Sequence, residues 1–169
     1  LAVADELAFA TNDAGAQIAV WTEQRMTGER LVVVSARNGV GSWSVPRLAQ
    51  ATTATGSQPA VAIDANGVAM IVWRAQAGSG PGLIRARGYD TATDQFGNEL
   101  EVDPGQSTND MRNPRVVALG QGSFLATWEQ VGGGGAYDLR ANTGSMTAWQ
   151  AAPATLELGA GTVDQSRVV

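Results

Sequence analysis

Residues 59–73 read PAVAIDANGVAMIVW, and the same phrase recurs at 7–21 as LAFATNDAGAQIAVW and at 114–128 as PRVVALGQGSFLATW. The final Trp residues of the three copies are Trp21, Trp73 and Trp128, which are 52 and 55 positions apart. Each copy also has a Gly six residues before this Trp. A second aromatic follows each Trp at a nearly constant distance, as Trp43, Phe96 and Trp149. A period of this length indicates a repeat architecture, in which the aromatic residues pack between units.

Each repeat predicts four short antiparallel strands. Its apolar runs are short and separated by Gly-rich turns, and in the second repeat the strands are expected at 60–63, 68–73, 83–87 and 96–102. Four such strands in a unit of about 50 residues are typical of a β-propeller blade. We therefore expect an all-β chain of three complete propeller-type blades plus the first strand of a fourth. A β-sandwich is the alternative, because it also has short strands and frequent turns.

The chain is expected to be a single repeat domain over residues 1–169. Its blade repeats fall at about 7–56, 57–111 and 112–163, and an orphan strand at 164–169 matches the lead-in to the third repeat. Because repeat units bury their apolar faces against their neighbours, three blades leave apolar faces uncovered. The chain is therefore expected to be part of a larger propeller, completed by further copies or by missing blades.

The composition excludes several kinds of chemistry. The chain has no His, Cys or Lys, and its 11 basic residues, all Arg, are outnumbered by 16 Asp and Glu. A Ser-His-Asp triad and thiolate metal sites are therefore excluded. The acidic balance argues against a nucleic-acid partner, and no apolar run is long enough for membrane insertion. With no catalytic constellation visible, we expect no catalytic residues, no cofactor and no enzymatic activity.

Three loops that follow the repeated Trp residues differ freely between repeats, at 22–30, 74–82 and 129–135. Variable loops on a repeated scaffold commonly carry binding specificity. The candidate ligand-binding residues are polar side chains of these loops together with three Arg of the expected third strands: Glu23, Arg25, Arg74, Gln76, Glu129, Gln130, Arg37, Arg87 and Arg140. The three third-strand Arg residues lie near equivalent repeat positions, so they would either form a ring around an axis or bond neighbouring units.

Calcium is the one metal that the sequence leaves open. Asp90, Asp94 and Asn98 could supply oxygen ligands, although no EF-hand pattern is present and a solvated sheet edge explains the same residues. The turn residues Asp13 and Asp64 are expected to cap their own hairpins rather than to bind metal.

The segment 85–117, RARGYDTATDQFGNELEVDPGQSTNDMRNPRVV, resembles the tandem β-propeller-type repeats of large secreted bacterial proteins, some of which carry hemolysin-type calcium-binding repeats. More distantly, the chain resembles the sialidase-type propellers built from Asp-box repeats. The Asp-box pattern S-x-D-x-G-x-x-W is absent, however, from residues 35–43, where it would be expected. The resemblance implies an extracellular or cell-surface location, with the periplasm as the alternative.

Three functions are compatible with these observations. The one we expect is a non-catalytic bacterial module that binds a protein or glycan ligand in adhesion or assembly. The alternative is a fragment of a sialidase-like, glycoside-processing propeller enzyme whose catalytic residues lie partly outside this chain. The second alternative is a purely structural subunit that assembles by strand addition through residues 164–169.

Overall fold

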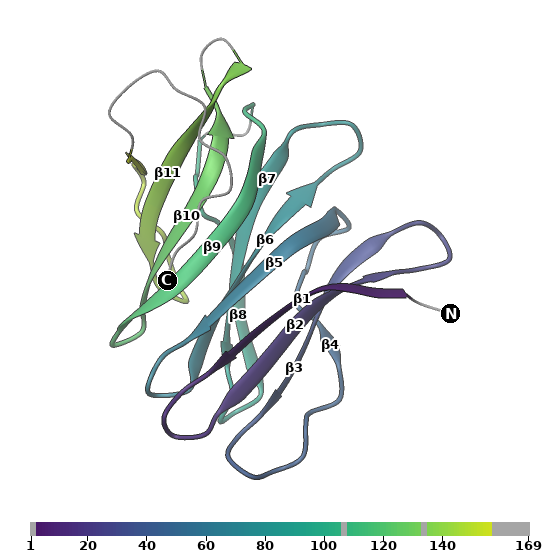
Figure 1. The fold of residues 1–169 in the computed structure, drawn as a ribbon, viewed down its shortest axis with the longest axis vertical. Helices are drawn as coiled ribbons and strands as arrows, with labels where there is room; N and C mark the ends of the chain where they lie inside the picture. The colour runs from purple at the N-terminus through teal and green to yellow at the C-terminus, as the bar shows by residue number, and fades with distance from the viewer. Residues whose placement is uncertain (1–2, 106–107, 133–134, 157–169) are drawn as a thin grey trace.

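The computed structural model describes residues 3–105, 108–132 and 135–156, which form three four-stranded antiparallel sheets (Figure 1). The first blade contains β1 (Val3–Thr11), β2 (Gln17–Gln24), β3 (Arg30–Arg37) and β4 (Arg47–Leu48). The second contains β5 (Thr55–Ile63), β6 (Val68–Gln76), β7 (Gly82–Asp90) and β8 (Gln95–Glu101). The third contains β9 (Met111–Gly120), β10 (Ser123–Val131), β11 (Tyr137–Gly144) and β12 (Ala154–Thr155).

In each sheet the strand order follows the sequence, as in the blade of a propeller. The first strands of the blades, β1, β5 and β9, contact one another in that order, and we call them the inner strands (Figure 1). The prediction of propeller-type blades is confirmed, and the sandwich alternative is not, because the strands form three separate sheets rather than two. The orphan strand expected at 164–169 lies outside the described residues. In the described part of the chain, no helix is long and apolar enough to cross a membrane.

The core lies between the blades. Successive residues of a strand point to opposite faces, and in β6 this sends Ile71 and Trp73 toward the first blade and Met70 and Val72 toward the third. Trp128 of β10 repeats the arrangement by facing the second blade, and both Trp73 and Trp128 are 0% exposed. In the second and third blades, the recurring Trp therefore packs its blade onto the blade before it, whereas Trp21 of the first blade is only partly buried.

In the first and second blades, a side chain caps the hairpin between the first and second strands. Asp64 Oδ1 accepts the backbone N–H of Val68 at 2.9 Å, which confirms the cap predicted there. In the first blade the cap is Asn12, whose Oδ1 accepts from Ala16 at 3.0 Å, so the prediction for Asp13 is wrong. The reason is positional, because Asn12 and Asp64 both stand nine residues before their Trp, whereas Asp13 stands eight before.

Candidate functional site

A residue in the left-handed conformation recurs near the start of each inner strand. Glu6 in β1, Gln58 in β5 and Asn113 in β9 each have a φ of 53°. The pairing register with the second strand shifts at the same places, which marks a β-bulge in each blade. The spacing of these bulges along the chain equals that of the repeated Trp residues, so the bulges belong to the repeat.

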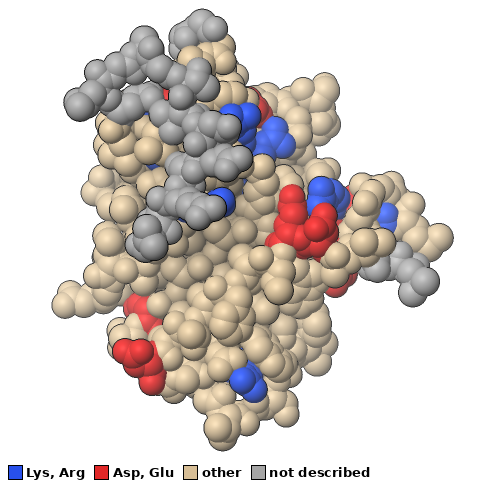
Figure 2. Space-filling view, in the orientation of Figure 1, with Lys and Arg blue, Asp and Glu red and all other residues tan. Residues whose placement is uncertain are grey.

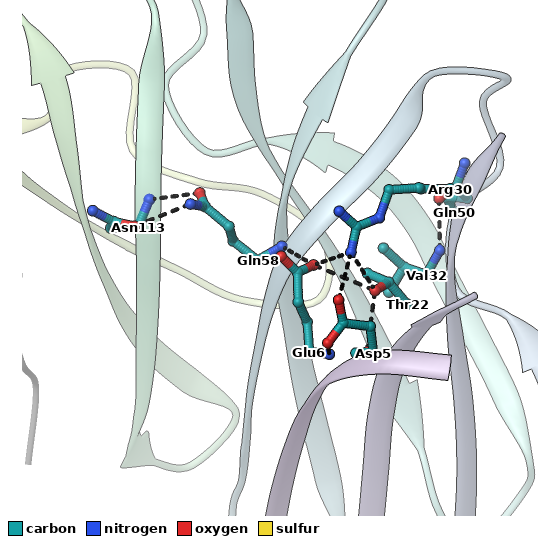
Figure 3. Close-up of polar contacts among 8 residues, drawn as sticks. All are labelled: Asp5, Glu6, Thr22, Arg30, Val32, Gln50, Gln58 and Asn113. Carbon is teal, nitrogen blue, oxygen red and sulfur yellow. Dashed lines mark hydrogen bonds and ion pairs between the residues drawn. The ribbon is translucent and has the colours of Figure 1, made fainter. Parts of the chain in front are cut away.

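The three bulge residues form a hydrogen-bonded ladder across the blades (Figure 3). Glu6 Oε2 accepts the backbone N–H of Gln58 at 2.9 Å, and Gln58 Oε1 accepts the backbone N–H of Asn113 at 2.9 Å. Gln58 Nε2 also donates to Asn113 Oδ1 at 3.1 Å. A bulge takes its residue out of the regular strand pairing, and here the side chain of the preceding blade satisfies the freed N–H.

Arg30 organises the end of the ladder in the first blade. Its Nη2 lies 3.3 Å from Asp5 Oδ2 and 3.4 Å from Glu6 Oε2, and it donates to Thr22 Oγ1 at 3.2 Å. Figure 3 shows these side chains converging on the guanidinium. The Asp5 side chain is 69% exposed and that of Glu6 is 30% exposed. Two carboxylates therefore share one cation, and the more exposed one faces solvent.

The ladder continues into the third blade through Glu129. Asn113 Nδ2 donates to Glu129 Oε2 at 3.1 Å, and Arg112 Nε donates to the same oxygen at 2.8 Å. Glu129 is 0% exposed, so its charge needs these partners. The Arg112 guanidinium also lies 3.6 Å from the ring centroid of Tyr137, which holds it in place.

A third Arg joins the second blade to the start of β9. Arg74 Nη2 donates to Asp110 Oδ1 at 2.7 Å, and its Nε donates to the carbonyl oxygen of Met111 at 2.9 Å. We call the ladder and the charged or hydroxyl side chains around it the inner-strand polar row: Asp5, Glu6, Thr22, Arg30, Gln58, Arg74, Asp110, Arg112, Asn113 and Glu129.

The inner-strand polar row is suited to a hydroxyl-rich ligand. It contains carboxylate acceptors, guanidinium donors and side-chain amides, which together can bind hydroxyl groups as donors and as acceptors. Charged side chains occupy only a few places on the otherwise uncharged face drawn in Figure 2. Each of the three blades contributes one Arg to the row, and each of these Arg is ion-paired.

Five of the six loop residues singled out from the sequence lie inside the second strands, near their ends, so the loop prediction is wrong for them and holds only for Arg25. Two of them, Arg74 and Glu129, belong to the inner-strand polar row. Gln76 accepts from Arg74 Nη1 at 2.9 Å. Arg25 lies in the turn after β2, where its backbone pairs with Glu29.

The remaining two loop candidates hold the repeated Trp residues. Glu23 Oε1 accepts from Trp21 Nε1 at 3.0 Å, and Gln130 Oε1 accepts from Trp128 Nε1 at 3.3 Å. Both acceptors stand two residues after their Trp. The side chains of Glu23 and Gln130 therefore each have a structural partner. A role in ligand binding stays a prediction for all six candidates.

The three third-strand Arg residues do not come together. Arg37 lies 16 residues after the Trp of its repeat, Arg87 lies 14 after and Arg140 lies 12 after. The three side chains are therefore at different positions along their strands. Arg87 Nη1 donates to the carbonyl of Ala49 in the first blade at 3.0 Å. The Arg37 guanidinium lies 5.3 Å from the ring centroid of Trp43, and Arg140 donates to Thr155 of β12 at 2.9 Å. No ring of the three forms, and their role in ligand binding stays a prediction.

The calcium candidates have protein partners. Asp90 Oδ1 accepts the backbone N–H of Ala92 at 2.9 Å, and Asp94 Oδ1 lies 3.1 Å from Arg47 and accepts a short hydrogen bond from the Tyr89 hydroxyl. Asn98 is exposed on β8. Among the residues that the structure describes, no three acidic side chains are grouped to hold a metal ion. Calcium binding here stays a prediction.

Sequence reasoning missed the ladder, although a signal for it was present. The residue directly before each repeated phrase is polar in all three copies: Glu6, Gln58 and Asn113. A long polar side chain at a fixed repeat position next to an apolar strand indicates a contact between units.

Comparisons with known proteins support the fold. No protein-family model and no curated protein matches the chain. Among solved structures, it is similar to the Hadza microbial sialidase Hz136 (TM-score 0.59, 13% identity), with 83% of this chain and 35% of that one covered. It is similar to an endo-arabinase from Bacteroides thetaiotaomicron VPI-5482 (TM-score 0.59, 14% identity), with 90% and 61% covered.

A third similar structure comes from work on the GH130 family of mannoside phosphorylases, which contains glycoside hydrolases that target β-1,2-mannosidic linkages in Candida mannan. The TM-score is 0.59 and the identity 8%, with 94% of this chain and 50% of that one covered. The chain therefore spans between about a third and three fifths of the length of these structures.

These comparisons correct the functional expectation. The prediction that the chain is not an enzyme is contradicted, because the structural neighbours are glycoside hydrolases and phosphorylases. The glycoside-processing alternative is better supported than the non-catalytic binding module. At these identities the likeness shows the fold alone, namely blades of a β-propeller of the kind found in sialidases and arabinanases.

Proposed function

We propose that this chain forms three adjacent blades of a glycoside-processing β-propeller, and that the inner-strand polar row forms part of the wall of its carbohydrate site. The observation that carries the proposal is the concentration of carboxylate and guanidinium groups at the starts of the inner strands. In this fold the structural neighbours process glycosides.

Two carboxylates of the row lie close together, beside Arg30. Glycoside hydrolysis commonly uses two carboxyl groups about 5–9.5 Å apart. Asp5 Oδ2 and Glu6 Oε2 both lie within 3.4 Å of one Arg30 nitrogen, so they are no further apart than such a pair. Asp5 is the better candidate for contact with a sugar, because its side chain is 69% exposed whereas Glu6 is held by the ladder.

The charge of the row favours a neutral glycan. Its three Arg residues are each paired with carboxylates, and the row holds four carboxylates in total. An anionic sugar would need guanidinium groups that are not already neutralised. We therefore propose a neutral oligosaccharide, such as an arabino- or manno-oligosaccharide, rather than a sialylated one.

Titration of the isotopically labelled chain with neutral and sialylated oligosaccharides tests the proposal. We expect backbone amide shifts at Asp5, Glu6 and Gln58 with a neutral oligosaccharide, and weaker shifts with sialyllactose. Asp5→Asn should weaken the response, whereas Asp90→Asn, at a turn remote from the inner strands, should not. Reducing-sugar release from the bound glycan measures turnover. Shifts absent from the row with every neutral oligosaccharide, together with no sugar release, would contradict the proposal.

A further inference from the structure

The outward face of the first blade leaves exposed two repeat positions that are partly buried in the second blade and buried in the third. Phe9 holds the repeat position of Val61 and Val116, twelve before the Trp, and the second aromatic Trp43 corresponds to Trp149. Phe9 is 53% and Trp43 42% exposed, whereas Val116 is 8% and Trp149 9% exposed. The ring centroids of Phe9 and Trp43 lie 6.4 Å apart on this face. The side chains at these two repeat positions are therefore exposed to solvent in the first blade and buried in the third.

The start of β1 repeats this difference in its hydrogen bonds. In the second and third blades, the backbone N–H of the bulge residue is accepted by a side chain of the preceding blade. In the first blade, the N–H of Glu6 is accepted at 2.8 Å by Oδ1 of its own neighbour, Asp5. The exposed Asp5 side chain thus stands where a preceding blade would place a Glu, Gln or Asn.

A hollow next to this N–H has room for such a side chain. It is lined by Ala4, Asp5, Glu6, Leu7 and Trp21. Leu7 is 73% exposed, while Pro59 and Pro114, which hold the same repeat position, are buried. The apolar face and the unshared N–H therefore meet at one place.

We propose that the outward face of the first blade is a docking surface for a further four-stranded blade of the same repeat, whose inner strand presents a Glu, Gln or Asn at its bulge. That side chain displaces Asp5 and accepts the N–H of Glu6. An aliphatic face of the incoming blade, like that formed by Met70 and Val72, covers Phe9, Trp21 and Trp43. The inference rests on the blade-to-blade contacts and holds whether or not the row binds a glycan.

A second copy of this chain is not the occupant. To extend the array, it would have to offer the outward face of its third blade. In β10, alternate residues to Trp128 point to that face, and of these Thr127 is 5% and Glu129 0% exposed. At Thr127 and Glu129 that face is already covered within the chain, although Leu119 at its far end is 56% exposed, so a second copy could not seat the middle of this face on the first blade.

A fusion that supplies the missing blade tests the inference. A copy of residues 55–110 placed directly before Ala4 reproduces the connection by which residue 110 leads into Met111, because Ala4 and Met111 hold the same repeat position. Since the chain has no Cys, Phe9→Cys gives a single reactive thiol on the docking surface. Leu119→Cys, at a position 56% exposed in the third blade, is the matched control.

We expect the thiol of Phe9→Cys to react about tenfold more slowly in the fusion than in the chain alone, because labelling then requires the added blade to open. The thiol of Leu119→Cys should react equally fast in both proteins. Replacing Gln58 of the added copy by Ala should restore part of the reactivity, since the ladder acceptor is lost.

Two results would overturn the inference. In one, Phe9→Cys reacts as fast in the fusion as in the chain alone. In the other, the thiol in the chain alone becomes protected as protein concentration rises and light scattering shows a dimer, which would make a second copy the occupant. Because no glycan is used, neither result bears on the proposed carbohydrate site.

Discussion

Replacing Gln58 by Ala removes the central member of the ladder. The change deletes two hydrogen bonds to Asn113, at 2.9 and 3.1 Å, and leaves the N–H of Asn113 without its acceptor in the interface. A hydrogen bond contributes about 1 kcal/mol net, and a buried donor left unpaired costs about 1–3 kcal/mol. We expect Gln58→Ala to lower the free energy of unfolding by about 2–3 kcal/mol. For a chain of this size, that lowers Tm by roughly 5–10 °C.

Two further variants separate the ladder from the backbone strain. Gln58→Gly loses the same bonds but relieves the left-handed conformation, so it should be about 1 kcal/mol less destabilising than Gln58→Ala. Gln121 has the same φ of 53° but lies exposed in a turn, with no side-chain hydrogen bond in the described part of the chain. Gln121→Ala should therefore change the stability by less than about 0.5 kcal/mol. Urea unfolding measures all three. A Gln58→Ala variant as stable as Gln121→Ala would refute a stabilising role for the ladder.

Three other perturbations test the packing and the buried ionisable groups. Val116→Ser should cost about 2 kcal/mol or more and its repeat equivalent Phe9→Ser less than about 0.5 kcal/mol in urea unfolding, because only Val116 is buried; equal losses would contradict the inter-blade core. Burial and the hydrogen bond to Asp94 raise the pKa of Tyr89 to about 12, so the folded state favours the neutral phenol. Stability should be intact below pH ~10 and fall by about 2–3 kcal/mol as the pH rises from ~10 to ~12, and Tyr89→Phe should abolish this loss in alkaline melts. Burial raises the pKa of Asp103, and among the described residues neither of its two carboxylate oxygens has a hydrogen-bond partner. Asp103→Asn should therefore stabilise the chain by about 1 kcal/mol at pH 7 and by less as the pH falls toward ~4. Urea unfolding at the two pH values measures this, and a stabilisation that does not change with pH would contradict the reasoning.

The sequence predicted the blades because their signal is local. Each of Trp21, Trp73 and Trp128, together with the turn six residues before it, lies within a single short phrase such as 59–73. All four strands expected in the second repeat are present: β5, β6 and β7 extend further at one or both ends, and β8 is shifted by one residue from the predicted range. The period correctly predicts the burial of Trp73 and Trp128, whereas Trp21, in the first blade, is only partly buried.

The candidate site was harder to predict because it depends on contacts between blades. The side chains of a regular strand alternate between its two faces, and this alternation is what the sequence pattern assumes. The bulges at Glu6, Gln58 and Asn113 interrupt it. The backbone N–H groups of Gln58 and Asn113 bind acceptors that lie a whole repeat away in the sequence. The alignment of Arg37, Arg87 and Arg140 failed for a related reason, since shifts of two residues keep the face of a strand but change the height along it.

The ladder has a direction, because in each step the side chain of one blade binds the main chain of the next. Donor and acceptor surfaces are therefore different, and such a heterologous contact cannot be satisfied by a two-fold axis. Repeated by rotation it generates a closed ring or an open helix, and the angle between successive blades alone decides which. Gene duplication or deletion of a whole blade would thus keep this kind of contact between neighbouring blades and change the number of blades in the array.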